Sequence, residues 1–417
     1  MSDSTAGDQA AVSLDELDKK FLSFEFAEDP YEYYRTLRSA EPAHFVAPMD
    51  AWIITSFDGV KSAFNDDRFQ VQYEKKQTQR MGPGMTGNDF YRVGSSFLVN
   101  NDPPQHGRLR RVFRQPFSPQ RVKAVRGAIE ARAHECIDAL IDAENKDIIA
   151  GYSSPVPLSL ITVLMDIPRA DEPMIKGWAH AFHLILAIHK MDGHELDEAN
   201  RQSREAEEYF VKLVRGRRAK PGDDFVSDVI RSNAGDDDPM TDEQIASNLF
   251  LLFFAGFDTQ NYTFANMVAA LDRNPEAKQY LLEDTSRAGE ILPELLRYDT
   301  AGQFMPRLAV EDIALGDVTI KAGQGVLLGM GAAAHYPLMF DYPDSLDVHR
   351  ANAGEARNVV FGYGRHHCIG SVLAHSNLEI MLRVLFERLP GQRVDWAGAV
   401  RKPSLSLHAY DALPITW

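Results

Sequence analysis

The sequence contains only two cysteines, Cys136 and Cys368, in 417 residues. They lie far apart and in dissimilar sequence contexts, so a disulfide framework is not expected. Thiols persist in reducing compartments, and a cytoplasmic location is therefore predicted. The scarcity of cysteine also makes the role of each sulfur a specific question.

A surplus of positive charge is also missing, since 44 basic residues face 60 acidic ones and the formal net charge is -16. Nucleic acids and anionic membranes attract proteins through positive charge, so neither partner is expected. The longest apolar run, residues 249–257, is well short of the roughly 20 residues that cross a bilayer. The N-terminal residues lack the apolar segment of a signal peptide or anchor, and no membrane association is predicted.

Neither internal repeats nor long Gly/Ser linkers divide the chain. We therefore expect residues 1–20 to form a flexible polar lead-in and residues 21–417 to form a single catalytic domain that acts as a monomer. Residues 72–101, which are polar with interspersed aromatics and glycines, are expected to form a long functional loop over a pocket.

Hydrophobic periodicity predicts a mainly α fold with minor β structure. Residues 43–57 have the pattern of a short hairpin around Pro48, and amphipathic helices follow from about residue 120 to 299. Thr241 and Gln244 have the spacing of a capping box, which places a helix start just before the apolar run. Short strands follow Tyr298, and a last helix is expected over residues 370–389.

Cys368 lies in the stretch FGYGRHHCIG, Phe361 to Gly370, directly before that last helix. A helix N-terminus lowers the pKa of a thiol because it offers N–H donors and the positive end of the helix dipole. Gly362 and Gly364 would allow a tight turn, and Phe361 could shield the sulfur from water.

A lone thiolate in a soluble protein has two main uses, as a nucleophile paired with histidine or as an axial ligand of haem iron. His366 and His367 keep the first use open. A zinc site needs about four nitrogen or sulfur ligands, and no second cysteine lies near Cys368.

The stretch resembles the FGxGxHxCxG signature of the cytochrome P450 family and meets every fixed position. The resemblance implies a soluble bacterial-type haem-thiolate monooxygenase, with haem b (iron protoporphyrin IX) between a long distal helix and the Cys-bearing helix N-terminus. It implies that Cys368 is the proximal iron ligand, with Phe361 and Gly362 beside the cofactor. By the same resemblance His366 binds a haem propionate.

Three further stretches resemble the family in its chain order. ELLR, residues 294–297, is similar to the family's ExxR, which implies a buried ion pair of Glu294 and Arg297 completed by Arg350. The stretches DPPQHGRLR and PRLAVED resemble propionate-binding segments. They nominate His106, Arg110 and Arg307.

AGFDTQ, residues 255–260, resembles the AGxDT segment of the family's distal helix. An aspartate at the end of an apolar run is costly unless it is used. Gly256 weakens the helix locally, and the Thr259 hydroxyl could bond into an opened turn. The resemblance implies a dioxygen groove at Ala255 and Gly256, with Asp258 relaying protons and Thr259 stabilising the bound oxygen species or its attendant water.

The implied reaction inserts one atom of dioxygen into a small hydrophobic substrate, most simply as a hydroxylation. Electrons must come from a separate ferredoxin and its reductase, because the chain has no room for a flavin domain and no ferredoxin-type cysteine cluster. A basic patch for that partner is expected on the proximal side. Its candidates are Arg108, Arg111, Arg114, Arg121, Lys123 and Arg365.

An apolar substrate pocket is expected around aromatic residues of segments that the family uses. Its candidates are Phe97, Phe253, Phe257 and Phe304. Tyr73, Lys75, Lys76 and Arg80 could meet a substrate carboxylate, although polar loop residues are more often solvated. His180, His183 and His189 lack a clear acidic or thiol partner and are interpreted as helix-surface or pocket-lining residues.

Two alternatives to an oxygen-dependent monooxygenase stay open. A peroxide-driven haem-thiolate enzyme would typically lack the acid and alcohol pair, so Asp258 and Thr259 argue against it. A non-catalytic haem sensor would be expected to carry an output module, such as a DNA-reading helix pair, and none is evident.

Overall fold

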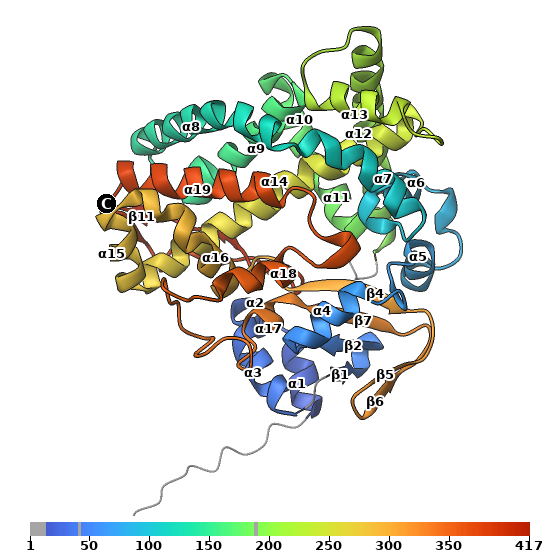
Figure 1. Ribbon diagram of the computed structural model, residues 1–417, viewed down its shortest axis with the longest axis horizontal. Helices are drawn as coiled ribbons and strands as arrows, with labels where there is room; N and C mark the ends of the chain where they lie inside the picture. The colour runs from blue at the N-terminus through green and yellow to red at the C-terminus, as the bar shows by residue number, and fades with distance from the viewer. Residues whose placement is uncertain (1–13, 41–42, 187–190) are drawn as a thin grey trace, which may run out of the picture.

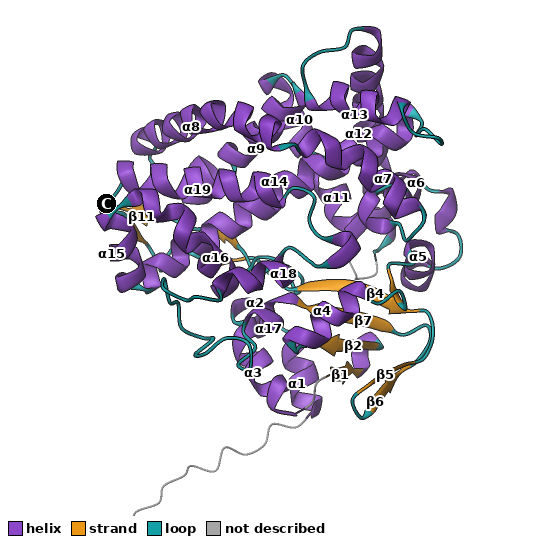
Figure 2. Cartoon of the chain, viewed as in Figure 1, coloured by secondary structure: helices purple, strands orange, loops and turns teal. Residues whose placement is uncertain are grey.

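The computed structural model describes residues 14–40, 43–186 and 191–417. Helices dominate it and the strands are short (Figure 2), which confirms the predicted mainly α class with minor β structure. The α-helices are α1 Leu14–Phe21, α2 Phe24–Glu28, α3 Pro30–Ala40, α4 Phe57–Asn65, α5 Tyr73–Met81, α6 Asp89–Ser95, α7 Gln105–Arg114, α8 Pro119–Asp142, α9 Pro155–Met165, α10 Glu172–Lys176, α11 Ala179–Leu186, α12 Gly193–Ala219, α13 Phe225–Ala234, α14 Asp242–Arg273, α15 Pro275–Glu283, α16 Ala288–Tyr298, α17 Met330–Ala334, α18 Arg357–Val360 and α19 Ser371–Arg388.

The main sheet lies at one end of the molecule, below the long helices in the view of Figure 1, and has the strand order β1-β2-β7-β4-β3. β2 pairs parallel with β7, and the other neighbours are antiparallel. Three two-stranded sheets complete the described β structure. The strands are β1 Ala43–Val46, β2 Ala51–Ile54, β3 Phe69–Gln70, β4 Phe304–Ala309, β5 Ile313–Leu315, β6 Val318–Ile320, β7 Gly325–Gly329, β8 Arg393–Val394, β9 Val400–Arg401, β10 Tyr410–Ala412 and β11 Ile415–Thr416.

The predicted hairpin is present in β1 and β2, which are joined by a short 3-10 turn over Ala47–Met49. Pro48 fits this turn because its fixed φ suits the first positions of a helical turn. Asp50, which closes the turn, has φ 47°, a left-handed conformation that aspartate tolerates better than most residues.

The long helix α14 runs through the interior and packs against α9, α12 and α19 (Figure 1). Its start is as predicted: the Thr241 hydroxyl accepts from the Gln244 N–H, and the Gln244 side chain accepts from the Thr241 N–H. These two bonds satisfy donors that a helix N-terminus otherwise leaves unpaired. Residues 249–254 of the apolar run are all buried, so this stretch of the helix packs within the core.

Two boundary predictions are wrong. The lead-in does not extend to residue 20, because residues 14–20 belong to α1, where Asp18 is buried and bonds His44. Residues 72–101 are not one long loop: they contain α5 and α6, whose apolar and aromatic side chains enter the main core. The many polar residues of this segment obscured the hydrophobic periodicity that would have predicted these helices.

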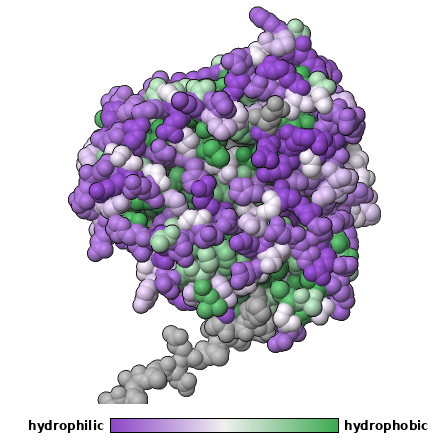
Figure 3. Space-filling model, viewed as in Figure 1, coloured by the Kyte–Doolittle hydropathy of each residue, from purple (hydrophilic) through white to green (hydrophobic). Residues whose placement is uncertain are grey.

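Hydrophilic side chains cover most of the face shown in Figure 3. Within the described residues, no helix is long and apolar enough to cross a membrane. A separate aromatic cluster near the sheet contains Phe21, Phe26, Tyr33, Tyr34 and Phe304.

Candidate functional site

The Cys368 loop is a tightly turned segment that ends just before α19. The Cys368 N–H donates to the Phe361 carbonyl at 2.8 Å. Gly362 and Gly364 have φ values of 70° and 64°, which favour glycine. A Cβ on Gly364 would also lie 2.3 Å from the side-chain oxygen of Asn65 in α4, so a larger residue would displace the loop.

The Cys368 side chain is accessible, yet burial among protein atoms raises the pKa of its thiol. The Gly370 N–H bonds the sulfur, and the Arg110 charge also acts to lower the pKa. This donor and this cation favour the thiolate form, which a metal-ligating cysteine needs. The other cysteine, Cys136, is buried in α8.

In the part of the chain that the structure describes, no histidine hydrogen-bonds the Cys368 thiol. A Cys–His nucleophile requires such a contact or a close approach to it. This geometry disfavours the nucleophile and leaves the metal-ligand hypothesis.

Four predicted anion-binding residues lie around this loop. His106 of α7 and His366 have ring centroids 3.9 Å apart. Burial, together with charges that include Arg110 and Arg307, lowers the pKa of His106 to about 4 and that of His366 to about 2. Both rings are therefore neutral at pH 7, and each has one N–H to donate.

Arg110 and Arg307 form no ion pair among the described residues, although Arg307 is only 8% exposed. Among the residues that the structure describes, the Arg307 guanidinium hydrogen-bonds only the neighbouring Pro306 carbonyl, at 2.8 Å. Burying a cation without a partner is costly. Two uncompensated arginines and two neutral histidine donors fit a ligand with two carboxylates, and haem is such a ligand.

The segment of α14 with the predicted dioxygen groove is a continuous α-helix, so the expected opening of a turn is not seen. The Thr259 hydroxyl donates to the Ala255 carbonyl at 2.7 Å. Thr259 is exposed although its neighbours Asp258 and Gln260 are buried. Gly256 has a packing role as well, because a Cβ there would lie 2.6 Å from Ile161 of α9.

Asp258 does not emerge at the surface but is 7% exposed and bonds His183 of α11, with Nε2 and Oδ2 2.9 Å apart. This partner was not predicted, because the two residues are 75 positions apart. The His183 side chain is 36% exposed, so the buried carboxylate contacts a partly accessible ring. His189 lies outside the described residues.

A second unforeseen contact joins α14 to the helix that follows Cys368. The Asn377 amide of α19 donates to the Gln260 side-chain oxygen at 2.7 Å, and both residues are buried. Gln260 directly follows Thr259 in sequence, and Asn377 lies nine residues after Cys368. The bond fixes the two helices relative to each other (Figure 1).

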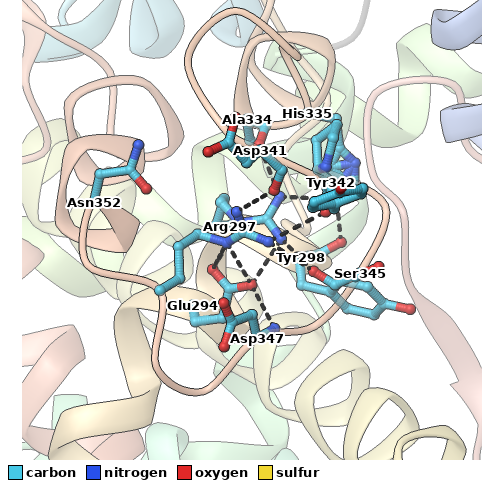
Figure 4. Close-up of polar contacts among 12 residues, drawn as sticks. Glu294, Arg297, Tyr298, Ala334, His335, Asp341, Tyr342, Ser345, Asp347 and Asn352 are labelled. Carbon is cyan, nitrogen blue, oxygen red and sulfur yellow. Dashed lines mark hydrogen bonds and ion pairs between the residues drawn. The ribbon is translucent and has the colours of Figure 1, made fainter.

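The predicted ion pair of Glu294 and Arg297 is present and fully buried. Arg297 donates to both oxygens of Glu294 at 2.7 and 2.8 Å, and Arg350 donates to the same oxygens at 3.0 and 3.1 Å. Figure 4 shows the Arg297 guanidinium enclosed by this carboxylate and backbone carbonyls. Those carbonyls belong to Ala334, Pro343 and Ser345.

The aromatic pocket candidates need correction. Phe253 and Phe257 share one face of α14. Each lies two residues before a residue of the predicted groove, Ala255 or Thr259, and so points about 200° away from it around the helix. Phe253 packs against Phe210 of α12 instead.

Two further candidates are fully or nearly fully packed. Phe304 lies in the aromatic cluster near the sheet, 5.4 Å from the Phe21 ring, and is buried there. Phe97 is buried between Phe182 of α11 and Phe250 of α14. It is therefore a core residue.

The expected basic patch is largely neutralised within the chain. Four of its cations pair with aspartates, and the pairs are Arg108–Asp238, Arg111–Asp236, Arg121–Asp228 and Arg365–Asp67. Only Arg114 and Lys123 have no acidic partner among the described residues. Attraction of an acidic partner by this surface is therefore weaker than the sequence suggests.

Comparison with known proteins gives a consistent result. Residues 44–390 match the sequence model of the family described as Cytochrome P450. The mycinamicin IV hydroxylase/epoxidase of Micromonospora griseorubida is 31% identical over 87% of this chain and 88% of its own length. The 6-deoxyerythronolide B hydroxylase of Saccharopolyspora erythraea is 30% identical, over 94% and 96%.

A solved structure also matches nearly the whole fold. The crystal structure of P450BioI in complex with acyl carrier protein ligated to hexadec-9Z-enoic acid superposes with a TM-score of 0.86. The match has 27% sequence identity and covers 94% of this chain and 100% of the other.

Proposed function

Since the chain belongs to the cytochrome P450 family and is a haem-containing monooxygenase of that family, we propose that it hydroxylates a small hydrophobic substrate with electrons from a ferredoxin and its reductase. The observation that carries the proposal is the Cys368 loop, where an accessible thiol receives the Gly370 N–H. The proposal includes haem b as the form of the cofactor, and a monomer in the cytoplasm.

We assign the cofactor contacts as follows. Cys368 ligates the iron, with Phe361 and Gly362 in the supporting loop, and His106, Arg110, Arg307 and His366 bind the two propionates. The bound haem supplies the activation of dioxygen, with one oxygen atom entering the substrate and the other leaving as water. The protein supplies ligand, pocket and protons.

Proton delivery is assigned to α14 and α11. His183 exchanges protons with the outside and passes them through its Nε2 to Oδ2 of Asp258, a contact of 2.9 Å. The Thr259 hydroxyl proton is committed to the Ala255 carbonyl. Its oxygen lone pairs are therefore free to accept a hydrogen bond from water or from dioxygen-derived species at the groove.

Turnover in a reconstituted system tests this function. Apolar compounds are screened by the shift of the Soret band on binding, and the best binder is incubated with NADH, ferredoxin, reductase and isotopically labelled dioxygen. We expect NADH-dependent product carrying one labelled oxygen atom. Product formed only from hydrogen peroxide would indicate the peroxide-driven alternative, and binding without any turnover would indicate a sensor.

A further inference from the structure

Helix α5 has a buried polar face that the sequence pattern did not reveal. Tyr73, Gln77 and Arg80 are buried and Lys76 is half-buried. At about 100° per residue these four side chains fall within an arc of about 100°, so they share one side of the helix. Lys75, by contrast, is exposed.

Three groups on this face have no partner for their hydrogens among the described residues. The Tyr73 hydroxyl and the Gln77 amide nitrogen make no hydrogen bond, although Gln77 is 0% exposed. The Lys76 ammonium forms no ion pair, and burial with the nearby Arg80 and Arg307 charges lowers its pKa to about 8. Buried polar groups in native proteins are nearly always satisfied. Since all three can donate, the matching ligand group is an acceptor with negative charge.

The face points toward α6 and α11. A Cβ on Gly94 of α6 would lie 2.2 Å from the Tyr73 hydroxyl oxygen and 2.9 Å from the Ile185 side chain, so these groups meet at one place. Arg80 donates to the Leu184 carbonyl of α11 at 2.9 Å. Helix α11 also carries His183, the partner of Asp258.

Two carboxylates are available for such a face, one on the substrate and one on the haem. The residues assigned to the propionates come from α7, β4 and the Cys368 loop, and none comes from α6 or α11. Tyr73 and Arg80 therefore lie toward α11, the helix that contacts Asp258, and not toward the residues assigned to the propionates. Lys76 lies between the two regions, within electrostatic reach of Arg307.

We propose that the α5 face, made by Tyr73, Lys76, Gln77 and Arg80, binds the carboxylate of the substrate. The substrate is then an amphiphile with an apolar body and one carboxylate end. This assignment rests on the proposed monooxygenase function and names the chemical class of its substrate.

Equilibrium binding to the haem-loaded protein tests the assignment. Dodecanoate and 1-dodecanol, which differ in the head group, are titrated by calorimetry into wild type, Lys76→Met, Tyr73→Phe and the control Lys75→Met. We expect wild type and Lys75→Met to bind dodecanoate about tenfold or more tightly than 1-dodecanol, because charge-assisted hydrogen bonds to the carboxylate are stronger than those to a hydroxyl. Lys76→Met should lose this preference and Tyr73→Phe should reduce it, with the alcohol affinity unchanged.

Haem content and the carbon monoxide spectrum of each variant separate the two sources of carboxylate. Loss of haem from Lys76→Met with an unchanged preference would show that the face serves a propionate, and would overturn the proposal. Equal binding of both probes by wild type, or binding of neither, would also overturn it. Failure of the monooxygenase function itself would show separately, as the absence of a thiolate-type spectrum in wild type.

Discussion

Replacing Glu294 by glutamine is expected to lower the free energy of unfolding by about 3–5 kcal/mol. The carboxylate accepts five hydrogen bonds, two each from Arg297 and Arg350 and one from the Asp347 N–H. Glutamine has one acceptor oxygen and no charge, so Arg297 would be left as a fully buried cation with backbone carbonyls but no anionic partner. Urea unfolding followed by circular dichroism measures the change.

The matched control is Glu290→Gln in the same helix. Glu290 is exposed and accepts a hydrogen bond from the Tyr280 hydroxyl at 3.3 Å. Its replacement should change stability by less than about 0.5 kcal/mol. A Glu294→Gln effect as small as the control's would mean that this ion pair does not support the fold.

Thr259→Ala is expected to reduce the product formed per NADH consumed by about tenfold or more, with the missing electrons recovered as hydrogen peroxide. In the proposed mechanism, the substitution removes the oxygen that accepts a hydrogen bond at the groove. Because the hydroxyl bonds only a carbonyl of its own helix, haem content, substrate binding and stability should be unchanged. The measurement is the ratio of product and peroxide to NADH in the reconstituted system.

Thr259→Ser is the control, since it keeps the hydroxyl and should retain most of the coupling. If Thr259→Ala produced as little peroxide as wild type, Thr259 would have no part in proton delivery. Equal uncoupling of both variants would point instead to loss of the methyl group as the cause.

Features encoded locally were predictable from the sequence. The capping box at Thr241, the hairpin around Pro48 and the turn at Gly362 and Gly364 depend on residues within a few positions of one another. Each of these patterns has a physical cause that does not depend on the rest of the fold. The contact of Arg350 with Glu294 was predicted only through family resemblance.

Contacts between distant helices were not predictable. His183 was recognised as unusual, but its partner Asp258 could be identified only after α11 and α14 were placed together. The bond from Asn377 to Gln260 has the same character, since it spans 117 positions. Two isolated polar residues in separate amphipathic helices give no pairwise signal in a single sequence.

Other errors had a signal that was overlooked. The helical period alone places Phe253 and Phe257 opposite Ala255 and Thr259, so these phenylalanines could have been removed from the pocket. The same arithmetic groups Tyr73, Lys76, Gln77 and Arg80 on one face of a possible helix. Their burial, however, depends on α6 and α11 and needed the structure.

The central claim is that Cys368 binds haem iron as a thiolate, and the absorption spectrum of the reduced protein with carbon monoxide tests it most directly. Wild type and the control Cys136→Ser should both give the strongly red-shifted Soret band of thiolate-ligated haem. Cys368→His should lose that band and give a spectrum of imidazole-ligated haem, or bind no haem. A red-shifted band that persists in Cys368→His, or a wild-type protein without it, would contradict the account.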